Sequence, residues 1–141
     1  MMVSTKGRYA LRVMLELAAH DPQAYIPLRQ IAEHQEISEK YLEAIIKILV
    51  QARFVQGLRG KGGGYRLAKE PRAYTVGSIL KLTEGSLAPV ACLECKPNAC
   101  PRAASCATLP MWRELDRLID SYLEGITLDR LAQPGREKID A

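Results

Sequence analysis

Residues 28–69 read LRQIAEHQEISEKYLEAIIKILVQARFVQGLRGKGGGYRLAK. Pro27 is well placed to open a short helix ending near Gln35, because proline is preorganised for the first turn of a helix. Ser38 can then cap a second helix over about residues 39–52. Apolar side chains at helical spacing give that helix one buried face: Leu42, Ile45, Ile46 and Leu49. Two helices joined by so short a turn are typical of a helix-turn-helix.

Two short strands are predicted directly after the second helix, over residues 54–58 and 65–67. The glycine-rich segment 59–64 lies between them and predicts a turn, with Arg59 and Lys61 at its tip. A basic hairpin in this place is a wing. The segment resembles a phosphate-binding loop only superficially, because a strand rather than a helix follows it.

Further helices are expected on both sides of this unit. The first runs from a cap at Ser4 or Thr5 to about Ala19. Another covers residues 76–84, between a Thr75 cap and a Gly85 stop. A longer one runs from about residue 108 to 123, and Thr127 caps a short helix over 128–132. The sequence therefore predicts a mainly α fold with a small β-wing.

The positive charge is confined to the first half of the chain. The net charge is +4, and residues 1–70 hold 11 Lys and Arg against 7 Asp and Glu, whereas residues 71–141 hold 9 of each. No acid lies between Ala44 and Lys69. A basic face on a helix-turn-helix favours binding to nucleic acid over an ordinary solvated surface.

Composition also limits where the protein works. No stretch reaches the roughly 20 apolar residues that span a bilayer, and the first residues lack the layout of a signal peptide. We therefore expect a cytoplasmic protein without a membrane partner. No nucleophile–base pair or paired carboxylates suggest an enzyme.

Polar side chains on the outer face of the second helix of the motif are candidates to contact DNA. A carboxylate on such a helix can accept a hydrogen bond from a cytosine amino group, which gives Glu43 a possible role in reading bases. Arginine on a wing suits a narrow minor groove. The candidate DNA-binding residues are Ser38, Lys40, Tyr41, Glu43, Lys47, Arg59 and Lys61.

All four cysteines lie in one segment without helical periodicity, as Cys92-x2-Cys95-x4-Cys100-x5-Cys106. Closely spaced thiolates suit an iron–sulfur cluster, and four of them also satisfy structural zinc. A thiol–disulfide switch at Cys92 and Cys95 is the third reading. Spacing alone leaves the three open. A small electron carrier with an iron–sulfur loop is an alternative class of protein. That function would leave the basic winged half of the chain unexplained.

The motifs STKGRYAL, LRGKGGGYRLAKEP, TVGSILKLTEG and LPMWRELDRLIDSYLEGITLDRL resemble a family of winged-helix regulators over nearly the whole chain. That family includes the iron–sulfur regulator IscR, the nitric-oxide sensor NsrR and the cysteine-metabolism regulator CymR. The resemblance implies a homodimer whose long C-terminal helices cross while two recognition helices read a palindromic operator. It places Lys40, Tyr41, Glu43 and Arg59 at DNA-contacting positions. Lys40 departs from the small polar residue found there in IscR.

The same resemblance implies a [2Fe-2S] or [4Fe-4S] cluster on Cys92, Cys100 and Cys106. Cys95 is an additional cysteine beside these three, and we expect it to be the fourth ligand. Leu109 stands where IscR has a ligating histidine, and Arg8 where NsrR-like members have a carboxylate. Glu94 or a group of the partner chain are the other candidates for the fourth position. His34 is expected to be a surface residue. The alternative is a cluster-free regulator with structural zinc or a thiol switch, controlled by a metabolite or a partner enzyme of sulfur metabolism.

The resulting division of the chain has four parts. Residues 1–85 form the winged helix-turn-helix, 86–107 a cysteine-rich sensor loop, 108–132 the dimerisation helix with a short terminal helix, and 133–141 a polar tail. We expect a homodimeric transcription regulator, a repressor by type, that senses iron–sulfur status or redox and nitrosative stress.

Overall fold

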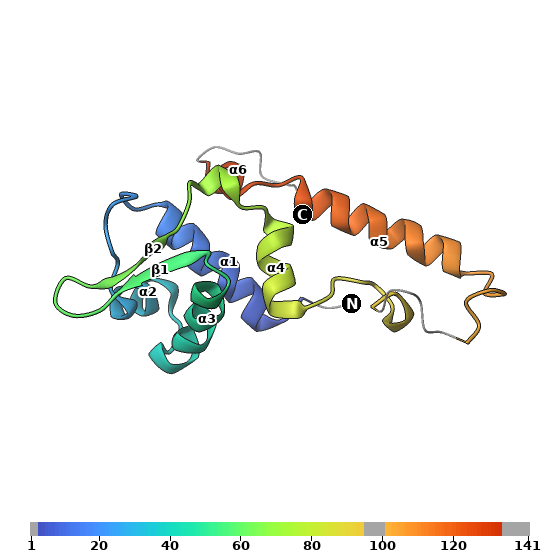
Figure 1. Ribbon diagram of the computed structural model, residues 1–141, viewed down its shortest axis with the longest axis horizontal. Helices are drawn as coiled ribbons and strands as arrows, with labels where there is room; N and C mark the ends of the chain where they lie inside the picture. The colour runs from blue at the N-terminus through green and yellow to red at the C-terminus, as the bar shows by residue number, and fades with distance from the viewer. Residues whose placement is uncertain (1–2, 95–100, 134–141) are drawn as a thin grey trace.

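The computed structural model describes residues 3–94 and 101–133. Helices and one hairpin follow each other along the chain as Figure 1 shows. The helices are α1 (Thr5–Ala18), α2 (Leu28–Gln35), α3 (Glu39–Gln51), α4 (Val76–Glu84), α5 (Leu109–Glu124) and α6 (Leu128–Ala132), and the strands are β1 (Val55–Leu58) and β2 (Gly64–Leu67). Short 3-10 helices cover Pro71–Ala73 and Ala91–Leu93. The predicted fold, mainly α with a small β-wing, is confirmed.

Three of the predicted caps, Ser4, Ser38 and Thr75, accept hydrogen bonds from backbone amides, whereas the predicted cap Thr127 forms no side-chain cap bond at the start of α6. The Ser38 hydroxyl accepts from the Tyr41 amide at 3.2 Å, which begins α3. Thr75 and Ser78 form a reciprocal capping box at the start of α4. Glu36, between α2 and α3, has a left-handed backbone with φ of 54° and ends α2 there. The left-handed backbone of Glu36 and the Ser38 cap set the tight turn between α2 and α3.

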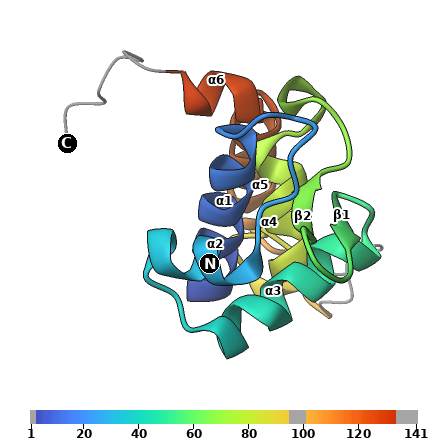
Figure 2. The ribbon, with the colours of Figure 1, turned by 90° about the vertical axis from the view of Figure 1, so that its left-hand side faces the viewer.

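The core of the winged unit surrounds α1, which Figure 2 shows in the middle of the other helices. Its largest fully buried side chains come from α1 to α4, β1 and α6: Val13, Met14, Ile31, Leu42, Ile45, Leu49, Val55, Ile79 and Leu128. The contribution of α6 follows from backbone pairing, because the Leu128 amide donates to the Tyr74 carbonyl at 2.9 Å. The short terminal helix therefore packs into the core of the winged unit.

The wing is an antiparallel hairpin in which Val55 pairs with Leu67 and Leu58 with Gly64. Ile26 and Tyr65 exchange two backbone hydrogen bonds of 2.8 Å, so the segment before α2 forms a bridge with β2. Gly64 permits this approach. A Cβ at Gly64 would lie 2.3 Å from the Ile26 carbonyl oxygen, and its φ of 152° already disfavours other residues.

Helix α5 extends away from the winged unit and contacts it through α4 (Figure 1). Gly77 allows this contact, because a Cβ there would lie 2.8 Å from the Glu124 side chain. Lys81 pairs with Glu124 at 3.0 Å and with Asp120. The segment leaving α4 turns along α5, and residues 86–94 share a hollow with α5 side chains such as Arg113 and Arg117. In the described ranges, we find no helix with the length and apolar character needed to cross a membrane.

Candidate DNA interface and cysteine segment

Helix α3 has one buried face and one exposed face. The four apolar residues predicted to be buried are all at most 2% exposed. The predicted polar residues Ser38, Lys40, Tyr41, Glu43 and Lys47 are all exposed. The core therefore fixes the helix and leaves its polar face available to bind DNA.

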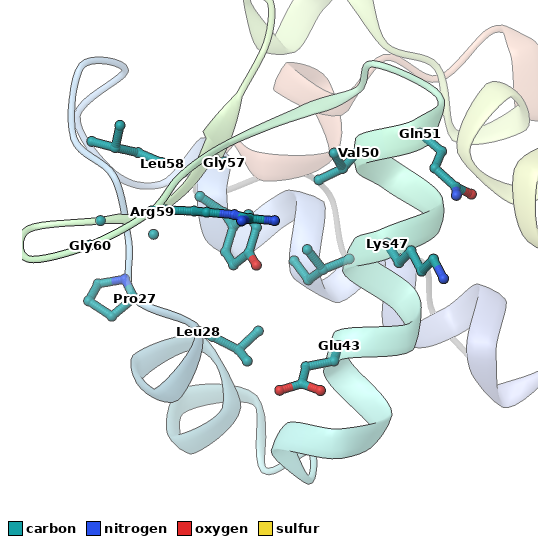
Figure 3. Close-up of a pocket in the computed structure, with 14 residues that line it drawn as sticks. Pro27, Leu28, Glu43, Lys47, Val50, Gln51, Gly57, Leu58, Arg59 and Gly60 are labelled. Carbon is teal, nitrogen blue, oxygen red and sulfur yellow. The ribbon is translucent and has the colours of Figure 1, made fainter.

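A groove separates α3 from the wing, and Figure 3 shows its walls. Glu43 points into it from α3, and the Arg59 side chain extends from the hairpin toward that helix. Lys47 lies farther along α3 and points toward the other side of the helix in this view. The structure thus brings Glu43 and Arg59 to one opening, although 16 positions separate them in the sequence, and Lys47 is also among the residues that line it.

Part of the groove is apolar, which the sequence reading missed. Val50 and Leu58 line it and are 38% and 49% exposed, and Leu28 of α2 also lines it. Apolar side chains on such a surface suit the methyl group of thymine or the sugar edge of a groove. The sequence pattern that could have predicted this apolar surface is the position of Val50, which falls outside the buried stripe of α3.

The basic residues near the wing differ in their surroundings. Arg59 and Lys61 are exposed at the hairpin tip, as predicted. Arg66 instead lies over the Tyr25 ring, with its guanidinium 4.4 Å from the ring centroid, and donates to Gln56 at 3.3 Å. It braces the base of the wing, so the cations at the tip are the ones best placed to contact phosphate.

The Tyr41 side chain contacts α1. Its ring meets the Tyr9 ring edge-on, with the centroids 5.8 Å apart. The Arg12 guanidinium lies 5.0 Å from the centroid of the same Tyr9 ring. These contacts orient the first turn of α3, where Tyr41 is one of the candidate DNA-binding residues.

Two of the four cysteines belong to the described residues. Cys92 lies in the 3-10 turn Ala91–Leu93, and Cys106 lies just before α5; both are half-buried and neither forms a disulfide. Hydrogen bonds from the hydroxyl and amide of Thr108 hold the pKa of the Cys106 thiol below its usual value. Cys95 and Cys100 lie outside the described residues. A lowered thiol pKa favours the thiolate, the form that binds soft metals.

This combination of winged fold, exposed polar helix and basic hairpin tip defines a DNA-binding regulator. Residues 3–134 match the Rrf2 family, described as an iron-dependent transcriptional regulator, and the chain belongs to that family. It is 37% identical to the HTH-type transcriptional regulator IscR of Aliivibrio salmonicida over 131 residues, which cover 93% of this chain and 77% of that protein.

Solved structures show the same likeness. The global cysteine regulator CymR of B. subtilis superposes with a TM-score of 0.77 at 36% identity, covering 94% of this chain and 96% of that one. IscR of T. potens superposes with a TM-score of 0.74 at 35% identity, covering 97% and 94%. The chain is a winged-helix transcription regulator that binds DNA, and it is not an enzyme.

Proposed function

We propose that two copies of this chain read a palindromic operator with the outer face of α3 and the wing, and that thiolates of the cysteine segment bind an iron–sulfur cluster that controls this activity. The proposed DNA binding rests on one observation, the groove that both Glu43 and Arg59 line. Arg59 lies within the acid-free stretch of the sequence, and Glu43 comes directly before it. Base contacts come from α3, with Glu43 accepting from cytosine. Contacts to phosphate or the minor groove come from Lys40, Tyr41, Lys47, Arg59 and Lys61, while Ser38 caps the helix.

The experiment for this half compares Arg59→Ala with Arg72→Ala in gel shifts against the operator at several salt concentrations. Arg72 is also an exposed arginine, but it pairs with Glu70 at 2.7 Å on the Pro71–Ala73 turn, away from the groove. We expect Arg59→Ala to weaken binding and to reduce the salt slope by about one. Equal binding by both variants would remove Arg59 from the interface.

The homodimer is supported by an uncovered apolar face on α5. Met111, Leu115, Leu118 and Tyr122 recur every three or four residues on one side of the helix and are 39–58% exposed. Trp112 and Ile119 are further apolar residues of α5 that are only partly exposed, and Ile119 packs against the core beside α4. One side of α5 thus contacts its own chain, and the other suits the same helix of a second copy.

The cysteine segment fits an iron–sulfur cluster in its donor chemistry. The described thiols Cys92 and Cys106 are half-buried and not in disulfides, and the Cys106 thiol has a lowered pKa. Cys92, Cys100 and Cys106 would hold the cluster, with Cys95 as fourth ligand. A bound cluster supplies sensitivity to iron supply, oxygen and nitric oxide. The cysteine segment joins α4 to α5. Binding or loss of a cluster in this segment would therefore change how α5 is placed relative to α3.

Purification without oxygen tests whether the protein binds an iron–sulfur cluster. We expect a brown preparation with visible absorption and matching iron and sulfide contents, and a different operator affinity after the iron is removed. A colourless, zinc-loaded protein that binds the operator equally well would contradict the cluster. A cytoplasmic location stays a prediction.

A further inference from the structure

Two histidines and a carboxylate meet where α1 approaches the end of α2, away from the cysteine segment in the sequence. Glu16 lies in the last turn of α1, His20 follows four residues later, and His34 comes from the end of α2. His20 Nε2 lies 2.7 Å from Glu16 Oε2, and His34 Nδ1 lies 3.2 Å from the same oxygen. All three potential donor atoms lie within 4.8 Å of one another.

We propose that Glu16, His20 and His34 form a binding site for a divalent transition-metal ion of the zinc type. Two imidazoles and one carboxylate are a known zinc ligand set that leaves the fourth position for water. Donors around a tetrahedral zinc lie roughly 3.4 Å apart, because each bond is about 2.1 Å. The present spacing therefore needs only small side-chain adjustments to accept an ion.

The burial of the three side chains suits a site that an ion can enter. The Glu16 side chain is 9% exposed, that of His20 26% and that of His34 51%. The carboxylate is thus fixed in the protein, while His34 forms an open side toward solvent. Rotation of this exposed imidazole is the adjustment that closes the site.

A second layer of hydrogen bonds orients the carboxylate. Gln35 Nε2 donates to the other oxygen, Glu16 Oε1, at 2.8 Å, and Arg12 Nε donates to Gln35 Oε1 at 3.1 Å. Burial opposes ionisation of Glu16, but hydrogen bonds from Gln35, His20 and His34 outweigh it and hold the pKa of this carboxyl below its usual value. Partners of this kind are typical of groups that orient metal ligands.

An ion at this site would connect α1 to the end of α2, one turn before the recognition helix. Arg12, which holds Gln35, also lies over Tyr9, and Tyr9 packs against Tyr41. The site therefore adjoins the contacts that orient the first turn of α3.

The test uses the full chain with its four cysteines replaced by serine, so that thiolates cannot bind the added metal. Zn²⁺ and Co²⁺ are titrated, with binding followed by calorimetry, Co²⁺ absorption and the thermal unfolding midpoint. We expect one ion per chain, a Co²⁺ spectrum without thiolate charge-transfer bands, and a higher unfolding midpoint. Binding should weaken as the pH falls, because metal binding requires deprotonated ligands and releases protons.

His20→Gln and His34→Gln are the test variants, and Glu33→Gln is the matched control on the same surface of α2. Each His variant should lose at least about 100-fold in Zn²⁺ affinity, because even residues behind the ligands contribute about 10–100-fold. Glu33→Gln should bind as the parent does, since Glu33 is an exposed carboxylate that pairs with Arg29. The exposure of His34 makes its replacement compatible with folding. Absence of binding in the parent, or equal binding in all variants, would overturn the proposal.

Discussion

Arg59 and Glu43 line one groove but carry opposite charge, so the roles that we propose for them in binding DNA differ. Arg59 is attracted to every phosphate, whatever the sequence. Glu43 is repelled by phosphate and contributes only where a base offers a donor. In the proposed interface, the groove therefore combines a contact to any DNA sequence with a contact that selects a base.

Replacing Glu43 with alanine should therefore relax base preference more than it changes affinity. The variant loses an acceptor for cytosine, and discrimination at one operator position should fall by about 1–3 kcal/mol. Binding to randomised operators, followed by sequencing, measures this directly. Glu33→Ala is the control, because it removes an exposed carboxylate from α2. An unchanged preference in Glu43→Ala would show that Glu43 does not read a base.

Glycines of the wing differ in what they tolerate. Gly64→Ala should destabilise the protein by about 1–3 kcal/mol or more, because the new Cβ would clash with the Ile26 carbonyl as well as adopt an unfavourable φ. Gly62→Ala is the control, since its φ is 78° but no atom lies within 4 Å of the added Cβ. Urea unfolding of both variants measures the difference. Equal losses would mean that backbone strain alone, and not the Ile26–Tyr65 bridge, requires glycine at residue 64.

At the scale of elements, the sequence predicted what depends on local signals. The caps at Ser38 and Thr75 and the apolar period of α3 specify helices that the structure has at nearly the same bounds. Interactions between distant segments could not be predicted in this way. In the sequence, Arg66 is one of several basic residues between Ala44 and Lys69, and only the fold shows that it lies over the Tyr25 ring. Glu16 and His34 meet because two helices pack, and no spacing rule encodes that meeting.

The contact between α4 and α5 depends on an ionised carboxylate. Hydrogen bonds from Thr75 and then Lys81 hold the pKa of Glu124 below its usual value. Interactions with Asp120 and Glu124 raise the pKa of Lys81 in turn. Glu124 therefore stabilises the folded chain above its unfolded pKa of about 4.5, and this stability is lost as the pH falls through the lower folded value.

Glu124→Gln should lower the free energy of unfolding near neutral pH and leave it little changed in strong acid. The difference should stay below about 1 kcal/mol. The side chains of Lys81 and Glu124 are 39% and 35% exposed, so solvent screens their attraction. Unfolding by urea at a series of pH values checks this. A loss of the same size at every pH would contradict a role for the charge of Glu124.

At the scale of the whole molecule, α5 connects the winged unit to the cysteine segment. Its inner side packs on α4 of the winged unit, and its N-terminal end follows directly on the cysteine segment. The sequence predicted this helix, but the division of its apolar residues into an inner and an uncovered side needed the position of α4. A second chain on the uncovered side would set the spacing between two copies of α3.

Leu118→Glu should therefore convert the protein to a monomer and abolish tight operator binding. Leu118 is 51% exposed near the middle of the apolar face, and a second α5 packed there would bury an unpaired carboxylate at a cost of about 3 kcal/mol or more. Arg117→Glu is the control, because Arg117 is exposed on another side of α5. Sedimentation equilibrium gives the mass of each variant, and circular dichroism establishes that both fold. A dimeric Leu118→Glu protein would place the dimer contact elsewhere on the chain, whereas a monomer that still binds the full operator tightly would separate dimerisation from DNA recognition.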